Sequence, residues 1–115
     1  MTHPIVERIL SGQVAPNVKL AAARGALPIP REDLIELWVQ LRTDGDGEVR
    51  LSCKESLAAV AESEWVDLLP GHEFAPPVLD FAIRVLGKNP KILQAALLNP
   101  GSPHASVAWL AAQVP

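Results

Sequence analysis

The sequence predicts an all-α protein of about seven to eight short helices. Apolar residues recur at helical spacing in successive segments, and the period-two alternation of a half-buried strand is almost absent. Proline and glycine interrupt these segments at short intervals, so we expect brief connections and antiparallel neighbours. The clearest pair lies between Leu34 and Val60, where two amphipathic patterns flank an acidic turn. The length of 115 residues suits a single domain, residues 1–115.

Two helices are predicted before residue 26. Thr2 can cap the first, which has Pro4 in its opening turn and stops at Gly12. Its apolar face comprises Ile5, Val6, Ile9 and Leu10. The second runs over residues 16–24 and ends at Gly25. The proline-rich segment that follows should be extended, because a residue that precedes proline disfavours the helical conformation.

The third predicted helix starts at Pro30 and is strongly amphipathic. Its buried side should comprise Leu34, Ile35, Leu37, Trp38 and Leu41. The side facing water should comprise Arg31, Glu32, Asp33, Glu36 and Gln40. This division follows the periodicity of a surface helix.

The fourth predicted helix follows the acidic turn. Asp46 is a plausible N-cap, and Glu48 lies near the positive end of the helix dipole. The apolar stripe comprises Val49, Cys53, Leu57 and Val60. We therefore expect Cys53 to be a packed, unreactive thiol.

Four further helices are expected in the second half. Ser63 can cap residues 64–69, and further helices should cover residues 76–87 and 91–98. An eighth should begin near Ser102-Pro103 and reach Val114. Proline and glycine terminate or open each of these segments.

The central helix pair carries a family resemblance. The leucine-rich segment Leu34–Leu41 is followed by Asp44 and, six positions later, by Val49-Arg50 at the start of the next helix. This pattern resembles one HEAT repeat, best defined over residues 31–61. The resemblance implies a short right-handed α-α superhelix, in which Asp44 and Arg50 are structural residues that bridge neighbouring repeats. Cys53 stands where the family usually has a small alanine, and its volume suits that place.

The flanks resemble more degenerate repeats. Residues 4–25 are similar to a preceding HEAT-like repeat, and residues 64–114 to leucine-rich-repeat-variant or HEAT-like bacterial arrays. The second likeness depends on the loop Asn99–Pro103 and the Val-Leu-rich helix after it. A constant offset between Leu68, Val78 and their later counterparts indicates a faint internal repeat.

The acidic turn also raises the question of a cation site. Asp44, Asp46, Glu48 and Glu55 match four ligand positions of a twelve-residue calcium loop. Val49 stands where that loop needs glycine for its sharp turn, so a capped helix is the preferred interpretation. His3, His72 and His104 are too scattered to share a helix face. No metal, cofactor or catalytic residue is predicted.

The C-terminal segment lacks charge. From Ile92 to Pro115 there is no lysine, arginine, aspartate or glutamate, and the helix around Trp109 is apolar nearly all round. A terminal repeat that faces water should have a polar outer surface, so we expect another protein surface to bury this apolar helix. Three candidates could cover this helix. They are further repeats of a longer chain, of which this would be the N-terminal part, a second copy of this chain, and a foreign partner. Membrane insertion is disfavoured because the apolar run is interrupted.

The predicted function is a non-enzymatic scaffold for protein–protein interaction or assembly. Stacked helix pairs present an extended surface from their second helices. The candidate interaction residues are Lys19, Arg24, Arg50, Lys54, Glu55 and Trp109. The alternative is a HEAT-like repeat enzyme or nucleic-acid-binding module, similar to alkylpurine glycosylases or bilin lyases. The net charge of −3 disfavours nucleic acid, and the absence of a secretory signal makes the cytoplasm the expected compartment.

Overall fold

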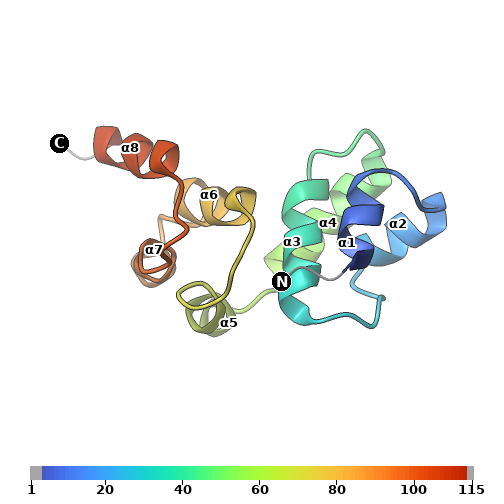
Figure 1. Ribbon diagram of the computed structural model, residues 1–115, viewed down its shortest axis with the longest axis horizontal. Coiled ribbons are helices and arrows are strands. Elements are labelled where there is room, and N and C mark those ends of the chain that lie inside the picture. Colours follow the sequence, from blue (N-terminus) through green and yellow to red (C-terminus); the bar gives the residue numbers. More distant parts are fainter. Residues whose placement is uncertain (1–3, 114–115) are drawn as a thin grey trace. The chain divides into compact units, whose positions relative to one another are not determined.

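A computed structural model describes residues 4–113 of the protein, and every regular element in this range is an α-helix (Figure 1). Two compact units divide the chain, one ending at Val60 and the other starting at Ala61. The first contains α1 (Pro4–Leu10), α2 (Pro16–Ala23), α3 (Arg31–Leu41) and α4 (Gly47–Ala58). The second contains α5 (Glu62–Leu68), α6 (Pro76–Arg84), α7 (Pro90–Leu97) and α8 (His104–Gln113). The all-α prediction is confirmed.

Glycines end α1 and α2. Gly12 has φ of 77° and Gly25 has φ of 76°, values in the left-handed region that glycine adopts without steric cost. After α2, the Ala26 N–H donates to the Ala21 carbonyl at 2.9 Å, which closes the helix end in a Schellman motif. The predicted stops at both glycines are therefore confirmed, whereas the Thr2 cap lies outside the described residues.

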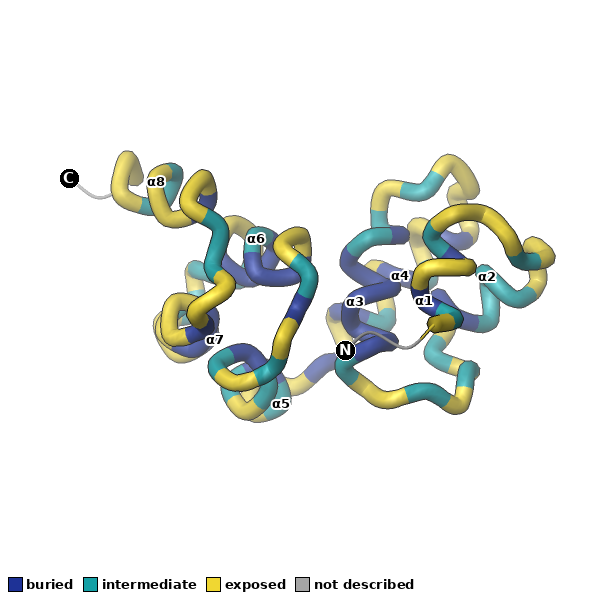
Figure 2. Tube along the Cα trace, in the orientation of Figure 1, coloured by how far each residue is buried: buried dark blue, intermediate teal, exposed yellow. Residues whose placement is uncertain are grey.

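Helix α3 forms the centre of the first unit. It packs against α1, α2 and α4, and Figure 2 shows it buried over most of its length. All five apolar residues predicted for its inner side are buried. Asp33 and Glu36, however, are only 4% and 3% exposed, so the prediction that they face water was wrong. Because three helices surround α3, its more polar side is covered as well.

Helix α4 starts as the sequence predicts. The Asp46 carboxylate accepts a hydrogen bond from the Glu48 N–H at 2.9 Å, which caps the helix. The predicted stripe of Val49, Cys53, Leu57 and Val60 is buried throughout. Part of the remaining circumference of α4 lines the candidate site described below.

In the second unit, α7 packs against α5 and α6, and α8 packs against α6. Helix α5 begins at Glu62 with Ala61 as its N-cap, so the predicted Ser63 cap was wrong. Its first turn carries Glu62 and Glu64, whose carboxylates suit the positive end of the helix. Helix α6 ends at Arg84, three residues short of the predicted end at Gly87.

Two asparagines organise the ends of α7. The Asn89 side chain caps the helix by accepting from the N–H groups of Lys91 and Ile92 at 3.0 and 3.4 Å. Asn99, which is buried, donates through Nδ2 to the carbonyls of Leu69 and His72 at 2.7 and 2.8 Å. The turn after α7 is thereby tied to the end of α5.

Helix α8 is held mainly through polar groups. Its buried residue is Ser106, whose hydroxyl donates to the Asp80 carboxylate. Arg84 pairs with the same carboxylate at 2.7 Å and lies 5.3 Å from the centre of the Trp109 ring. Val107 remains 40% exposed. The longest described helix, α4, has 12 residues, and none is long and apolar enough to cross a bilayer.

Candidate functional site: a groove along α4

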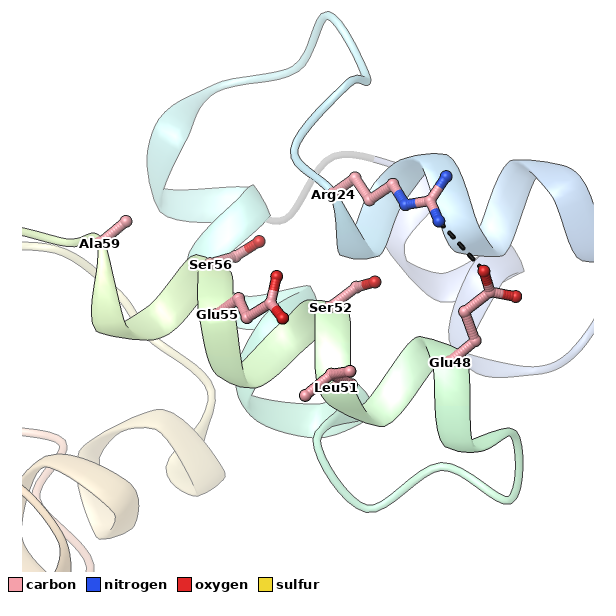
Figure 3. Close-up of a pocket in the computed structure, with 7 residues that line it drawn as sticks. All are labelled: Arg24, Glu48, Leu51, Ser52, Glu55, Ser56 and Ala59. Atoms are coloured by element: carbon pink, nitrogen blue, oxygen red, sulfur yellow. Dashed lines mark hydrogen bonds and ion pairs between the residues drawn. The ribbon is translucent and has the colours of Figure 1, made fainter.

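An open groove runs along the outer side of α4 in the first unit (Figure 3). Its volume is about 520 Å³. It is lined by Arg24, Glu48, Leu51, Ser52, Glu55, Ser56 and Ala59. Six of these residues come from α4 or its C-cap, and Arg24 comes from the end of α2.

The periodicity of α4 explains why these side chains meet. Val49 and Cys53 belong to the buried stripe, whereas Glu48, Ser52 and Glu55 follow at spacings of four and three residues on another side. Residues at those spacings lie one above another on a helix. Packing of the apolar stripe therefore turns a polar row outward, along the groove.

An exposed ion pair closes one end of the groove. The Arg24 guanidinium reaches from the end of α2 to the Glu48 carboxylate, with Nη2 and Oε1 at 3.1 Å (Figure 3). Both side chains are more than half exposed, so water screens the pair and its contribution to stability is small. The Glu48 carboxylate already serves as the anionic partner of Arg24, so Arg24 is less available to a ligand.

A second contact between α2 and α4 is shielded from water. The Ser56 hydroxyl donates to the Ala23 carbonyl at 2.6 Å, and both groups are partly or fully buried. This bond satisfies a carbonyl near the end of α2 that has no partner within its helix. It fixes the wall of the groove next to Arg24.

Leu51 and Glu55 are the groove side chains best placed to meet a ligand. Leu51 is 58% exposed, and Glu55, one helical turn later, is exposed as well. Across residues 4–113 the Glu55 carboxylate has no ion-pair or hydrogen-bond partner. An apolar contact and a free anion therefore lie side by side on one helix face.

The structure separates the predicted interaction residues. Arg24 and Glu55 line the groove, whereas Lys54 is exposed on α4 outside the groove lining. Trp109 belongs to the second unit, half-buried beside Arg84. Sequence reasoning missed Leu51, although a leucine on the polar side of the α4 pattern was a usable signal.

The polar groups of the acidic turn between α3 and α4 bond to other groups of the protein. Lys19 pairs with Asp44 through Nζ and Oδ1 at 2.6 Å, and the Asp46 N–H donates to the same carboxylate at 3.0 Å. The hydrogen bond from Lys19, followed by that from Asp46, holds the pKa of Asp44 below its usual range. Arg50 donates through Nη1 to the carbonyls of Asp44 and Gly45 at 2.7 and 3.1 Å. These carboxylates and carbonyls are therefore occupied by protein partners.

Cys53 is packed in the core, as predicted. Burial, with a smaller effect of Asp44, raises the pKa of the thiol to about 11, so it is protonated at neutral pH. Over residues 4–113, no group of three or more His, Cys, Asp or Glu residues is arranged to hold a metal ion.

The α4 groove combines three chemical means of reversible recognition. Leu51 offers apolar area, Glu55 offers an anion, and Ser52 offers a hydroxyl that can bond to a peptide backbone.

Comparison with protein-family models, with curated proteins and with solved structures finds no match for this chain.

Proposed function

We propose that the chain is a helical interaction module that binds a segment of a partner protein along α4. The observation that carries this proposal is that Leu51, which is 58% exposed, lies one helical turn from the Glu55 carboxylate, which has no partner among residues 4–113. A ligand gains apolar contact at the first residue and charge complementarity at the second. Arg24 is less available, because Glu48 already pairs with it.

The spacing of these two residues defines the ligand. Glu55 follows Leu51 by four positions, which corresponds to about 6 Å along the helix axis. An extended segment advances about 3.3 Å per residue, so its matching side chains stand two positions apart. We infer a segment with a large apolar side chain and, two positions away, a lysine or arginine.

The proposed architecture around this site is a short right-handed superhelix of HEAT-like repeats. Support comes from the pair between Lys19 and Asp44, which joins α2 to the turn between α3 and α4. This is the kind of link that the resemblance implies between successive repeats. Arg50 departs from the pattern, because it bonds to carbonyls of its own turn.

A peptide titration followed by NMR tests the binding proposal. The full chain, labelled with ¹⁵N, is titrated with a short peptide carrying leucine and lysine two positions apart, and with a matched peptide carrying glutamate for lysine. We expect the amide signals of Ser52 and Ala59 to shift with the lysine peptide, at a Kd of about 0.1–1 mM. Equal affinity for both peptides, or unchanged signals along α4, would contradict the proposal.

Variants locate the binding on the groove. Leu51→Ser should weaken the lysine peptide about tenfold because it removes apolar area. Glu55→Gln should weaken it about two- to fivefold, as expected for an exposed charge pair. Lys54→Gln is the matched control, since Lys54 is exposed on the same helix but does not line the groove. A loss of affinity in the control that equals the loss in Glu55→Gln would overturn the assignment to this groove.

A further inference from the structure

A second surface with exposed charged and apolar side chains lies between α5 and α7. Two adjoining hollows, of about 300 and 170 Å³, share Val66 and Lys91 in their linings and so form one continuous trough. We call it the α5–α7 trough. It lies wholly within the second unit.

The α5–α7 trough changes in character along its length. Glu62 and Asp67 of α5 line one hollow, and Lys91, from the first turn of α7, lies where the two hollows meet. Pro70 and Leu98, which follow the last turns, line the other end. Leu98 is 64% exposed, the highest value among the large apolar residues that the structure describes. The trough therefore has a charged end and an apolar end.

The charged end has an excess of negative charge. Glu62 and Asp67 contribute two carboxylates against the single amine of Lys91, and none of the three has an ion-pair partner in the described part of the chain. The α4 groove has the same balance, with Glu48 and Glu55 against Arg24. Each unit thus presents a leucine that is more than half exposed, beside a lining in which carboxylates outnumber cationic groups by one.

We infer that the α5–α7 trough is a second binding site for the same class of ligand, a protein segment with a large apolar side chain and a lysine or arginine. This inference rests on the proposed function of the α4 groove. Charge complementarity supports it, because a cation on the ligand compensates the excess carboxylate while an apolar side chain covers Leu98.

The dimensions of the α5–α7 trough set a different spacing from that of the α4 groove. The ligand cation lies in the hollow that Glu62 and Asp67 line together with Lys91. From Lys91 to Leu98 the chain advances seven residues, or about 10 Å along a helix. An extended ligand covers this distance in about three residues. The trough should therefore prefer leucine and lysine three positions apart, whereas the α4 groove prefers two.

Two peptides and two reporter regions test the inference on the full chain. We titrate ¹⁵N-labelled protein with peptides whose leucine and lysine stand two or three positions apart, and follow the amides of Val66 and Ala95 for the trough. The amides of Ser52 and Ala59 report on the α4 groove. We expect the three-position peptide to shift the trough signals, and Leu98→Ser to weaken that response about tenfold. Val85→Ser is the control, because Val85 is also exposed and apolar but lies outside the trough lining.

The outcomes distinguish the two proposals. Shifts along α4 with unchanged trough signals would overturn the second site and leave the first intact. Trough shifts without α4 shifts would overturn the proposed α4 site on which the common ligand class rests. If Leu98 instead contacts a second copy of this chain, the apparent mass by light scattering would rise with concentration and fall in Leu98→Ser without peptide. That result would also overturn the inference.

Discussion

Asn99 shows how one side chain can hold two loops. Its amide nitrogen donates to the carbonyls of Leu69 and His72, and its amide oxygen accepts from the Gly101 N–H at 2.8 Å. The residue is only 6% exposed, so water cannot readily replace these bonds. Removing the side chain takes this donor from the buried carbonyl of Leu69 and from the part-buried carbonyl of His72.

Asn99→Ala should reduce the free energy of unfolding by about 2–3 kcal/mol, because buried acceptors lose their donors. Urea unfolding followed by circular dichroism measures the loss. Asn89→Ala is the control, since it removes only an N-cap and should cost about 1 kcal/mol. Equal losses in the two variants would contradict the role assigned to Asn99.

Cys53 should resist alkylation in the folded protein. Burial raises the pKa of its thiol from 9.0 to about 11, so both access and thiolate fraction are low. Iodoacetamide labelling measured by mass spectrometry should be fast in urea and at least tenfold slower in buffer at neutral pH, an estimate based on thiolate fraction. Rapid labelling of the folded chain would contradict this burial.

The same pKa shift predicts an alkaline effect on stability. The unfolded chain ionises this thiol more readily, so the stabilising contribution is complete below pH 9.0 and is lost as pH rises toward about 11. Cys53→Ala should reduce this alkaline dependence in urea unfolding. An unchanged pH profile in the variant would show that Cys53 does not cause it.

Among the secondary-structure elements, the end of α2 depends on a close fit with α3. The indole Nε1 of Trp38 donates to the Ala22 carbonyl at 2.9 Å. A Cβ atom at Gly25 would lie 3.1 Å from the Trp38 ring, whereas one at Gly12 would meet no atom within 4 Å. The two glycines have nearly the same φ and differ in their surroundings.

Gly12→Ala should therefore cost about 1–2 kcal/mol from the left-handed backbone alone. Gly25→Ala should cost more, because the Trp38 ring would also have to shift, which would strain its hydrogen bond to the Ala22 carbonyl. Thermal unfolding of the two variants compares these costs directly. If Gly25→Ala is no more destabilising than Gly12→Ala, the close packing of Gly25 against Trp38 is contradicted.

The link between α2 and the acidic turn should depend on pH. The pKa of Asp44 is lowered from 3.8 in the folded chain, so its pairing stabilises the protein above that pH and is lost as pH falls through the folded pKa. Asp44→Asn should lose about 1 kcal/mol at neutral pH, with the deficit shrinking in acid. Glu48→Gln, whose pair is more exposed, should lose less in urea unfolding. A deficit in Asp44→Asn that persists unchanged in acid would contradict the assignment.

Local patterns predicted most of this architecture. Gly12, Gly25 and the Asp46 cap act within a few residues, so the sequence identifies them. The burial of Asp33 and Glu36 depends on three packed neighbours that the periodicity of α3 does not reveal. The same reason applies to the candidate site. Arg24 and Glu48 meet across 24 positions of sequence, so only the packing of α2 on α4 brings them together.

For the molecule as a whole, each of the two units carries one surface with an exposed leucine and an excess carboxylate. The α4 groove offers Leu51 and Glu55, and the α5–α7 trough offers Leu98 with Glu62 and Asp67. A mildly acidic chain, with a net charge of −3, should favour basic partners over acidic ones. We therefore predict a partner segment that is both apolar and basic.

The most direct measurement is a charge reversal at the α4 groove. Glu55→Lys and the unchanged chain are each titrated with the lysine peptide and the glutamate peptide, and the amide shifts of Ser52 and Ala59 give the affinities. We predict that the unchanged chain prefers the lysine peptide about two- to fivefold and that Glu55→Lys reverses this preference. The same preference in both proteins would contradict it.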